Sequence, residues 1–497
     1  MSAALPSPDV VVPYADARIT RAAGLYEGIV RGRRFVHNPY GWEALAVLSP
    51  HAATLLDSAD GRTVGEIARA TGRPLAALAR EVELLARNGF VRGEGIPALR
   101  RPPPSPPRFD LWVHLTNACN LDCPYCYIEK DSHALTEEVA RTLQRSIVES
   151  VREAGLKGVH LRFAGGEPML RFAFLQRFYE ETAELVAREG ATLSAAILPN
   201  GTRVPDGAAA WIRAHGVGVS VSIDGVGAVQ DAMRPAVGGG GSWEAVEEGL
   251  ARYLDAGVTP YALVTVSRQN LDAMPALTDW LLARGLGFRY SLVRDLEGGA
   301  SLLDARSTGW RPAQNLVTLR RKSAEAAPTV MLEGEMLARV QAVFADCYDR
   351  IEAMVPVRPS FRKTHRFCDL EWRRPIRKAC AAGEGSLAVS HEGRLSPCQA
   401  ALHHEGTLAL TDHTVLPRRA PEVSQLGDFT RRAPNETCAG CRFRASCAGG
   451  CPLMLYRRDG HVEGRSPYCE VFRAVLPRIL RIAALELVHE SEARTKG

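Results

Sequence analysis

Three cysteines within eight residues constrain this chain more than any other feature of its sequence. Cys119, Cys123 and Cys126 follow the spacing CX3CX2C, so a single loop can place three thiolates around a metal centre. Cysteines clustered this tightly are usually metal or redox ligands, and three unrelated buried thiols are the alternative. Three ligands leave one position of a four-coordinate iron-sulfur cluster open, and an open iron can bind a second molecule. The loop therefore predicts a reactive iron-sulfur centre.

The loop also has Tyr125 directly before its last cysteine, and this pattern resembles the signature of the radical S-adenosylmethionine (SAM) superfamily. The resemblance implies a 4Fe-4S cluster on the three cysteines, whose open iron chelates the amino and carboxylate groups of SAM. It assigns Tyr125 to the cofactor site. The reduced cluster would cleave SAM to methionine and a 5′-deoxyadenosyl radical, which takes a hydrogen atom from an unactivated C–H of the substrate.

The chain has 497 residues, which is too many for one ordinary hydrophobic core, so two to four domains are expected. Its 46 per cent hydrophobic and 24 per cent charged residues are typical of globular proteins, without an apolar run that could span a membrane. The N-terminus lacks the basic start and apolar stretch of a secretory signal, so we expect a soluble cytoplasmic protein. The formal charge of +5 comes without a long basic run and does not indicate nucleic-acid binding.

Six strand-like runs alternate with helical stretches in the middle of the chain. They lie at residues 109–116, 158–163, 191–198, 216–223, 260–266 and 285–293. Alternating strands and helices give a parallel sheet with helices outside, and six such repeats suit a partial (β/α)6 barrel. The predicted fold class is α/β, with a radical SAM barrel whose site lies at the carboxyl ends of the strands.

Polar motifs follow the second, third and fourth of these runs. Gly165-Gly166-Glu167-Pro168 resembles the superfamily motif that receives the SAM amino group, and its glycines permit close backbone approach to a ligand. Asn200 marks a turn or a contact to the SAM ribose. Ser222 and Arg234 resemble the ribose and carboxylate contacts of the peptide-modifying branch. A surface ion pair is the alternative for Arg234.

A second group of cysteines lies near the C-terminus. The spacings CX12GX4C and CX2CX5CX3C, followed by a last cysteine, match the SPASM extension of radical SAM enzymes. The resemblance implies two auxiliary 4Fe-4S clusters and therefore three clusters in all, while a zinc knuckle is the alternative. Cys347 is left over as a buried thiol. The implied ligands are Cys438, Cys441, Cys447 and Cys469 for one cluster, and Cys380, Cys398 and Cys451 for the other, with Cys368 as its candidate fourth ligand.

The first hundred residues predict a hairpin at 24–36, three short helices and a returning strand. Ser49-Pro50 marks the start of the first helix and Asp60-Gly61 its end, and a capping box at Thr63 opens the second, which ends at Gly72. The layout resembles the leader-peptide recognition (PqqD-like) domain of pyrroloquinoline quinone biosynthesis, where an exposed strand edge pairs with an extended leader peptide. A packing domain and a DNA-binding winged helix are the alternatives.

Together these features divide the chain into five segments. They are a winged-helix-like leader-peptide recognition domain (1–100), a Pro-rich linker (101–108), the radical SAM barrel (109–295), a bridging region (296–367) and the SPASM domain with a C-terminal helix (368–497).

The resemblance implies a radical SAM maturase, an oxidoreductase that acts on a ribosomally made precursor peptide bound through its leader. The expected product is an oxidative intramolecular crosslink, either C–C or thioether. Sulfatase-maturating enzymes resemble one another in having an Asp base after the second SPASM cysteine, where this chain has Gln399, and an amide cannot act as that base. Formylglycine formation is therefore the runner-up, and a non-catalytic iron-sulfur regulatory protein is the alternative of another class. We expect a low-potential electron donor such as flavodoxin or ferredoxin, and neither a nucleic acid nor a membrane as partner.

Overall fold

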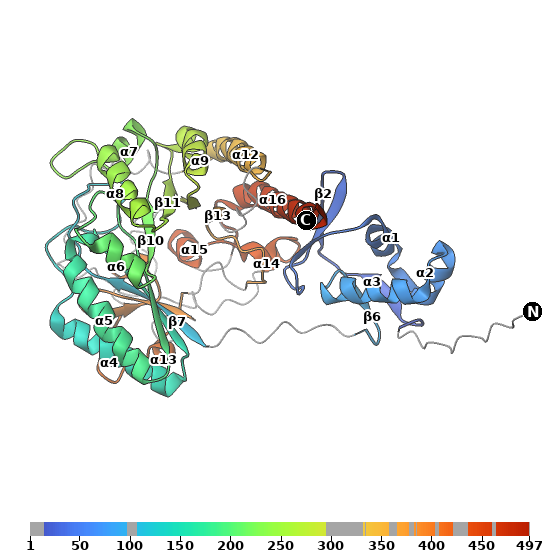
Figure 1. Ribbon diagram of the computed structural model, residues 1–497, viewed down its shortest axis with the longest axis horizontal. Coiled ribbons are helices and arrows are strands. Elements are labelled where there is room, and N and C mark those ends of the chain that lie inside the picture. Colours follow the sequence, from blue (N-terminus) through green and yellow to red (C-terminus); the bar gives the residue numbers. More distant parts are fainter. Residues whose placement is uncertain are drawn as a thin grey trace, which may run out of the picture.

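A ten-stranded sheet forms the body of the molecule, and a smaller N-terminal unit lies at the opposite end (Figure 1). The computed structural model describes residues 14–96, 107–294, 332, 334–356, 365–376, 382–383, 385–402, 407–420, 436–459 and 464–496.

The N-terminal unit contains two three-stranded sheets, ordered β5-β1-β6 and β2-β3-β4, and three helices. Its elements are β1 (Arg18–Arg21), β2 (Tyr26–Val30), β3 (Arg33–His37), β4 (Leu45–Val47), α1 (Pro50–Ser58), β5 (Asp60–Thr63), α2 (Val64–Thr71), α3 (Leu75–Arg87) and β6 (Val91–Gly93). The predicted hairpin is the antiparallel pair of β2 and β3.

Local signals set the helix starts of this unit as predicted. The Ser49 hydroxyl accepts the Ala52 N–H at 3.1 Å, and Thr63 forms both hydrogen bonds of its capping box. The first helix ends at Ser58, just before Asp60-Gly61, as predicted, but these two residues have a second role that was not predicted. These residues belong to β5, because Asp60 and Thr63 pair with β1 across the sheet.

The large sheet is parallel from β7 to β13. Its strands are β7 (Arg108–His114), β8 (Gly158–Ala164), β9 (Thr192–Ile197), β10 (Gly218–Ser222), β11 (Tyr261–Val266), β12 (Gly287–Leu292) and β13 (His365–Phe367). The strands stand side by side in chain order, so all their carboxyl ends meet at one edge, where sites of such sheets form. The six predicted strands are present. A seventh, β13, joins the sheet beside β12.

Three further strands extend the sheet beyond β7. They are β14 (Ser386–Val389), β15 (Arg394–Ser396) and β16 (Leu408–Ala409). Strand β14 pairs in parallel with β7, and β15 turns back antiparallel to it. The C-terminal segment is therefore bonded directly to the strand that leads into the cysteine loop.

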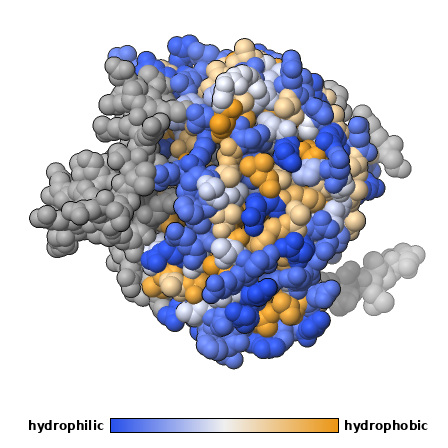
Figure 2. Space-filling model, turned by 90° about the vertical axis from the view of Figure 1, so that its left-hand side faces the viewer, coloured by the Kyte–Doolittle hydropathy of each residue, from blue (hydrophilic) through white to orange (hydrophobic). Residues whose placement is uncertain are grey.

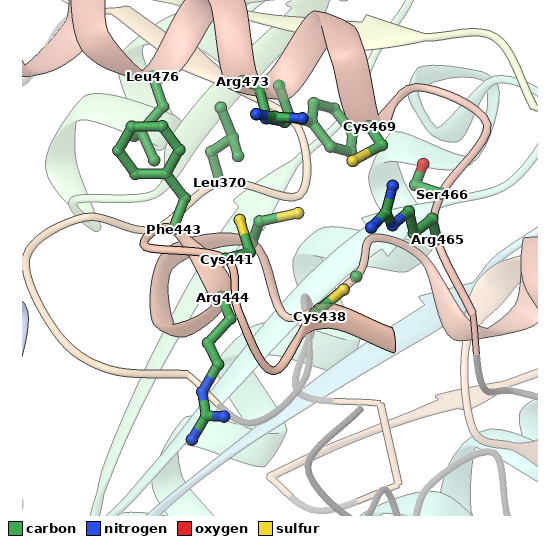
Figure 3. A pocket seen from close by; sticks show the side chains of 13 residues that line it. Leu370, Cys438, Cys441, Phe443, Arg444, Arg465, Ser466, Cys469, Arg473 and Leu476 are labelled. Atoms are coloured by element: carbon green, nitrogen blue, oxygen red, sulfur yellow. The ribbon is translucent and has the colours of Figure 1, made fainter. Parts of the chain in front are cut away.

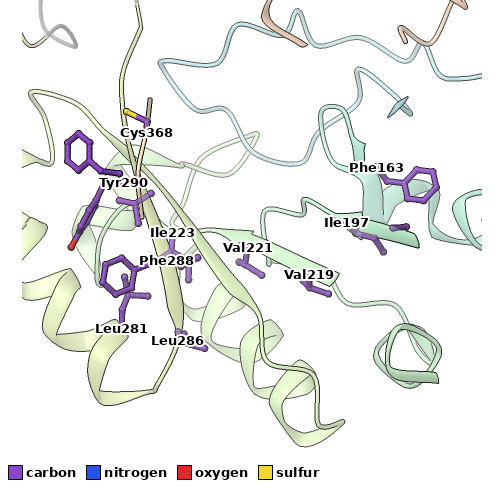
Figure 4. Packing of buried hydrophobic residues seen from close by; sticks show 14 of the residues in the cluster. Phe163, Ile197, Val219, Val221, Ile223, Leu281, Leu286, Phe288, Tyr290 and Cys368 are labelled. Carbon is purple, nitrogen blue, oxygen red and sulfur yellow. The ribbon is translucent and has the colours of Figure 1, made fainter. Parts of the chain in front are cut away.

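Helices cover the outer face of the parallel sheet (Figure 1). The longer helices of the barrel and of the segment that follows it are α4 (Glu137–Ala154), α5 (Phe172–Arg188), α6 (Ala208–Ala214), α7 (Ala228–Met233), α8 (Trp243–Asp255), α9 (Met274–Ala283) and α12 (Met336–Met354). Buried side chains such as Phe163, Val221 and Phe288 point from the strands into this helix layer (Figure 4).

The C-terminal region contains the short helices α13 (Leu416–Arg419), α14 (Arg444–Cys447) and α15 (Pro452–Asp459), and the long helix α16 (Cys469–Lys496). Helix α16 packs against α12 and reaches β2 and β4 of the N-terminal unit. Among the helices in the described ranges, none is long and apolar enough to cross a membrane. The view onto the barrel end is mostly hydrophilic, with scattered hydrophobic residues (Figure 2).

Candidate functional site

The CX3CX2C loop begins five residues after β7 ends, at the carboxyl edge of the sheet. Two isolated bridges, Thr116 to Ala134 and Leu121 to Ala236, fix its two sides. The Leu121 N–H points at the Cys119 sulfur over 3.4 Å. The fold thus gathers the three cysteines in one tethered loop, where they are only partly buried.

The thiols of this loop lie in an environment that disfavours free thiolates. Burial raises the pKa of Cys119 to about 11 and also raises the pKa of Cys123. A cation that binds there would remove this cost, because thiolates are the form in which cysteine binds metal. The donor chemistry of the loop therefore fits an iron-sulfur cluster.

The glycines of the Gly165-Gly166-Glu167 motif let it pack against the cysteine loop. A Cβ atom at Gly165 would lie 2.4 Å from the Thr116 carbonyl oxygen, and one at Gly166 would lie 2.3 Å from that of Ala118. The Gly166 N–H donates to the Thr116 carbonyl at 2.6 Å. The backbone of the cysteine loop approaches these glycines closely, and the approach of a ligand to them stays a prediction.

Glu167 is fully buried behind the loop. Its carboxylate accepts the N–H groups of Met169 at 2.8 Å and of Asn200 at 2.7 Å. Burial raises its pKa to about 7, because the two hydrogen bonds offset only part of the desolvation. A buried carboxyl of this kind gains from a cationic partner such as the ammonium group of SAM.

Asn200 lies beside the same loop. Its side-chain amide donates to the Asn120 side chain at 2.8 Å and points at the Cys119 sulfur over 3.9 Å. Its side-chain oxygen accepts from the Thr202 N–H at 3.0 Å. Asn200 therefore belongs to the turn and also reaches the cysteine loop.

Arg234 is held in the site by Asp224, a residue to which the sequence analysis gave no role. The Arg234 Nε donates to the Asp224 carboxylate at 2.8 Å, and both side chains are nearly inaccessible. Arg234 Nη1 lies 3.9 Å from the Cys123 sulfur, and its guanidinium stands 5.5 Å from the centre of the Tyr125 ring. The Tyr125 hydroxyl donates to the same carboxylate. The alternative of a surface ion pair for Arg234 is therefore wrong.

Two further polar residues, at the end of the fourth strand and in the helix α7 that follows it, differ in their roles. Ser222 ends β10 and is partly buried at the carboxyl edge. Asp231 accepts the N–H groups of Ser242 at 2.7 Å and of Trp243 at 2.8 Å, so it caps the start of α8. We assign Asp231 a structural role.

Four of the C-terminal cysteines line one small cavity, between the α14 segment and the start of α16 (Figure 3). They are Cys438, Cys441, Cys447 and Cys469. This is the set that the SPASM resemblance assigns to one auxiliary cluster. Burial raises the pKa of Cys447 to about 12, so these thiols also gain from a bound metal.

The second predicted ligand set is only partly described. Cys398 and Cys451 border the same small apolar cluster of Ala382, Ala401 and Leu453. Cys380 lies outside the described residues. Cys368 follows β13, where its sulfur accepts the Leu292 N–H at 3.4 Å, and it packs in the barrel core near Tyr290 (Figure 4).

The arrangement of these cysteines differs from that of a single-ion site. Within the described ranges, no three Cys, His, Asp or Glu side chains converge as they would around one metal ion. A cluster separates its thiolates by its own width, so it needs cysteines that line a shared cavity. Cys347 is fully buried in the core, as predicted for a left-over thiol.

Comparisons with known proteins found relatives of this chain. Residues 113–281 match the model of the Radical SAM superfamily. The serine-type anaerobic sulfatase-maturating enzyme of Klebsiella aerogenes is 25% identical over 386 residues, covering 73% of this chain and 84% of that protein. The PqqA peptide cyclase of Xanthomonas campestris pv. campestris is 24% identical over 384 residues, covering 73% and 87%.

Two solved structures share the fold. Native anSMEcpe with bound AdoMet and Cp18Cys peptide has a TM-score of 0.57 at 16% identity, covering 76% of this chain and 99% of that one. Streptococcus suis SuiB bound to precursor peptide SuiA has a TM-score of 0.50 at 13% identity, covering 91% and 100%. The radical SAM fold predicted from the sequence is confirmed.

Proposed function

We propose that this radical SAM enzyme, whose superfamily domain spans residues 113–281, installs an oxidative crosslink in a ribosomally made precursor peptide. It is an enzyme of the SPASM class, so the alternative of a non-catalytic iron-sulfur protein is set aside. Its similarity to a sulfatase-maturating enzyme and to a peptide cyclase supports a peptide or protein substrate.

The residues of the site divide the work of binding SAM. Cys119, Cys123 and Cys126 would hold the cluster, and Glu167 would accept the SAM ammonium. Arg234, directed by Asp224, would bind the SAM carboxylate, because a guanidinium matches a carboxylate with two hydrogen bonds. Gly165, Gly166, Tyr125, Asn200 and Ser222 complete the predicted cofactor site. When bound, SAM and its cluster would supply a radical that takes one hydrogen atom from the peptide. A second hydrogen would leave as a proton, and an auxiliary cluster would accept the electron that this step releases.

The observation that carries the oxidative part of the proposal is the cavity lined by Cys438, Cys441, Cys447 and Cys469. Four thiolates close a cluster, and a closed cluster passes electrons without binding substrate. A crosslink removes two hydrogens from the peptide, so it needs such an acceptor beside the SAM cluster. We propose three clusters in all, with Cys380, Cys398 and Cys451 on the third and Cys368 as its predicted fourth ligand.

Strand β4 is one of the edge strands of the N-terminal unit, and no described strand pairs with its outer side, although α16 packs near it. Strand β4 pairs with β3 on one side and ends the sheet β2-β3-β4. The opposite edge is covered, because Arg481 of α16 donates to the Ile29 carbonyl at 2.6 Å. An extended leader can add main-chain hydrogen bonds along β4. We propose this edge as the leader-binding site, with a flavodoxin or ferredoxin as electron donor.

The experiment is an anaerobic assay of the reconstituted protein with SAM, a low-potential reductant and the small peptide encoded beside its gene. We expect the peptide to lose two hydrogens while 5′-deoxyadenosine forms, as read by mass spectrometry. Cleavage of SAM with an unchanged peptide would contradict the proposed substrate.

Formylglycine formation is the second candidate, because the Klebsiella relative matures sulfatases and covers most of this chain. Oxidation of a serine to an aldehyde also removes two hydrogens, so mass alone does not separate the two reactions. An aminooxy reagent labels an aldehyde and leaves a crosslink unlabelled. Against this candidate, Gln399 follows Cys398 and an amide cannot accept the serine proton.

A further inference from the structure

The inner face of the barrel has an unusual charge pattern. Side chains of a strand alternate between its two faces, and Phe288 and Tyr290 of β12 point into the helix layer (Figure 4). Arg289 between them therefore points to the inner face, where its side chain is accessible although the surrounding barrel desolvates it. On β13, Phe367 packs against Phe344 at 4.8 Å between ring centres, so the exposed Arg366 also faces inward.

These two arginines are direct neighbours. Strands β12 and β13 are parallel, and their register pairs Arg289 with Arg366. Like charges side by side on adjacent strands are destabilising. Neither guanidinium forms a hydrogen bond or an ion pair with another described residue. A bound anion would relieve the repulsion between the two charges.

The surroundings are basic as well. Arg108 on β7 and Arg162 on β8 project from the same face. Among the described barrel strands, Asp110 is the one acidic residue on this face. Its carboxylate pairs with Arg162 at 2.8 Å. Burial is the main cause that lowers the pKa of Arg289; Arg294 and Arg162 lower this pKa further, while Cys368 and Tyr261 raise it. Arg294 is already occupied by Asp369 at 2.7 Å.

The position relative to the cofactor site matters for function. The register pairs Arg289 with Leu263 of β11 and Leu263 with Ser222 of β10. The arginine pair therefore stands at the depth of the predicted SAM contacts, two strands away from them. At this position, the arginine pair could meet a peptide bound beside the predicted SAM site.

We propose that Arg289 and Arg366 form a binding site for a carboxylate of the peptide substrate, either an acidic side chain or the C-terminal carboxyl. This inference rests on the proposed function and adds to it the chemistry of the substrate. Two guanidinium groups can bind a carboxylate with charge-assisted hydrogen bonds, which fixes both the position and the orientation of the peptide. The site acts by positioning the peptide and takes no part in cleaving SAM.

The test compares the full-length reconstituted enzyme with its Arg289→Gln/Arg366→Gln variant, using the precursor peptide encoded beside the gene. A matched control is Arg339→Gln, which removes an exposed arginine that pairs with Asp272 on the outer surface. We expect the double variant to raise the KM for the peptide by roughly tenfold or more, because charge-assisted hydrogen bonds are lost. It should also form more 5′-deoxyadenosine per modified peptide.

Peptide variants identify the carboxylate. Asp→Asn and Glu→Gln peptides test the side chains, and a C-terminally amidated peptide tests the terminus. With the wild-type enzyme, one of these peptides should show the same rise in KM as the double variant shows with the unmodified peptide. With the double variant, the same peptide should show no further rise in KM. Arg289→Lys keeps the charge and should recover part of the affinity, which separates this role from a folding defect.

Two results would overturn the inference. One is an unchanged KM in the double variant, and the other is equal use of the acidic and amide peptides by the wild-type enzyme. If the wild-type enzyme leaves the precursor unmodified, the proposed function fails on its own. Titration of both enzymes with the same acidic and amide peptides then decides the inference, since preferential acidic binding that the double variant loses supports it and equal binding overturns it.

Discussion

At the scale of single residues, Asp224 organises the cofactor site. It is inaccessible, and its carboxylate accepts from Arg234, from Tyr125 and from the Thr265 N–H at 2.7 Å. Its own carbonyl accepts from the Asn270 side chain at 2.8 Å. One carboxylate thus ties the arginine, the cysteine loop and two strands together.

Replacing Asp224 is therefore expected to weaken SAM binding and also to lower the stability of the fold. Asp224→Asn leaves the buried Arg234 charge without its partner, which costs several kcal/mol in typical buried pairs. We expect at least a roughly tenfold weaker Kd for SAM in the reconstituted enzyme, measured by calorimetry. Asp231→Asn is the matched control, because that carboxylate caps α8 and does not touch Arg234. Equal losses of SAM affinity in both variants would contradict the assignment.

Glu167 makes the free energy of unfolding of the metal-free protein depend on pH. Its folded-state pKa of about 7 lies above the ordinary value of 4.5, so the folded state binds more protons between these values. The free energy of unfolding therefore falls as pH rises through this window, by about 3 kcal/mol in total. The Gln side chain of Glu167→Gln does not titrate. In denaturant unfolding, the free energy of unfolding of the variant should therefore rise relative to that of wild type from pH 4.5 to 7. A difference that stays constant across this range would refute the assignment.

Sequence reasoning found the residues of this site that belong to local motifs and missed those that depend on strand pairing. The cysteine loop and Glu167 are recognisable from their spacing. The role of Asp224 depends on partners 99 and 10 residues away. Arg289 and Arg366 become neighbours only through β13, a three-residue strand too short to show a sequence pattern.

At the scale of elements, helix caps and long buried strands were predictable because their signals are local. Strand β5 was missed, since Asp60–Thr63 is polar and forms a strand only because β1 lies beside it. The pairing of β14 with β7 also has no local signal, because it joins residues far apart in the chain.

The outer edge of β4 leads to a prediction about the leader peptide. If the leader pairs along this edge, every second leader amide donates to it. N-methylation of one such amide removes a net hydrogen bond of about 1 kcal/mol and should weaken binding about fivefold. Fluorescence polarisation with leaders methylated at successive residues should therefore show alternating strong and weak effects. Uniform effects along the leader would argue against strand addition.

At the scale of the whole molecule, the N-terminal unit contributes to the wall of the four-cysteine cavity that we propose as an auxiliary-cluster site. Tyr26 of β2 packs against Phe443 with 5.2 Å between ring centres, and Phe443 lines the cavity of four cysteines. His37 of β3 contacts the Trp372 carbonyl at 2.8 Å. Helix α16 starts at the cavity with Cys469 and continues to the same sheet. Deleting the unit would therefore disturb both leader binding and the auxiliary centre.

A point substitution separates these two effects. Tyr26→Ala removes an aromatic contact of about 1 kcal/mol from the wall, so local opening should become about fivefold more frequent. We expect faster loss of auxiliary-cluster iron to a chelator, followed by absorbance and electron paramagnetic resonance. Tyr40→Ala, at a ring that is 62% exposed in the same unit, should leave this rate unchanged. Because the leader edge is β4 and Tyr26 lies on β2, leader affinity should stay at the wild-type value. If iron loss is unchanged while leader affinity falls, the N-terminal sheet serves the peptide alone, and the auxiliary centre is closed by the C-terminal region without it.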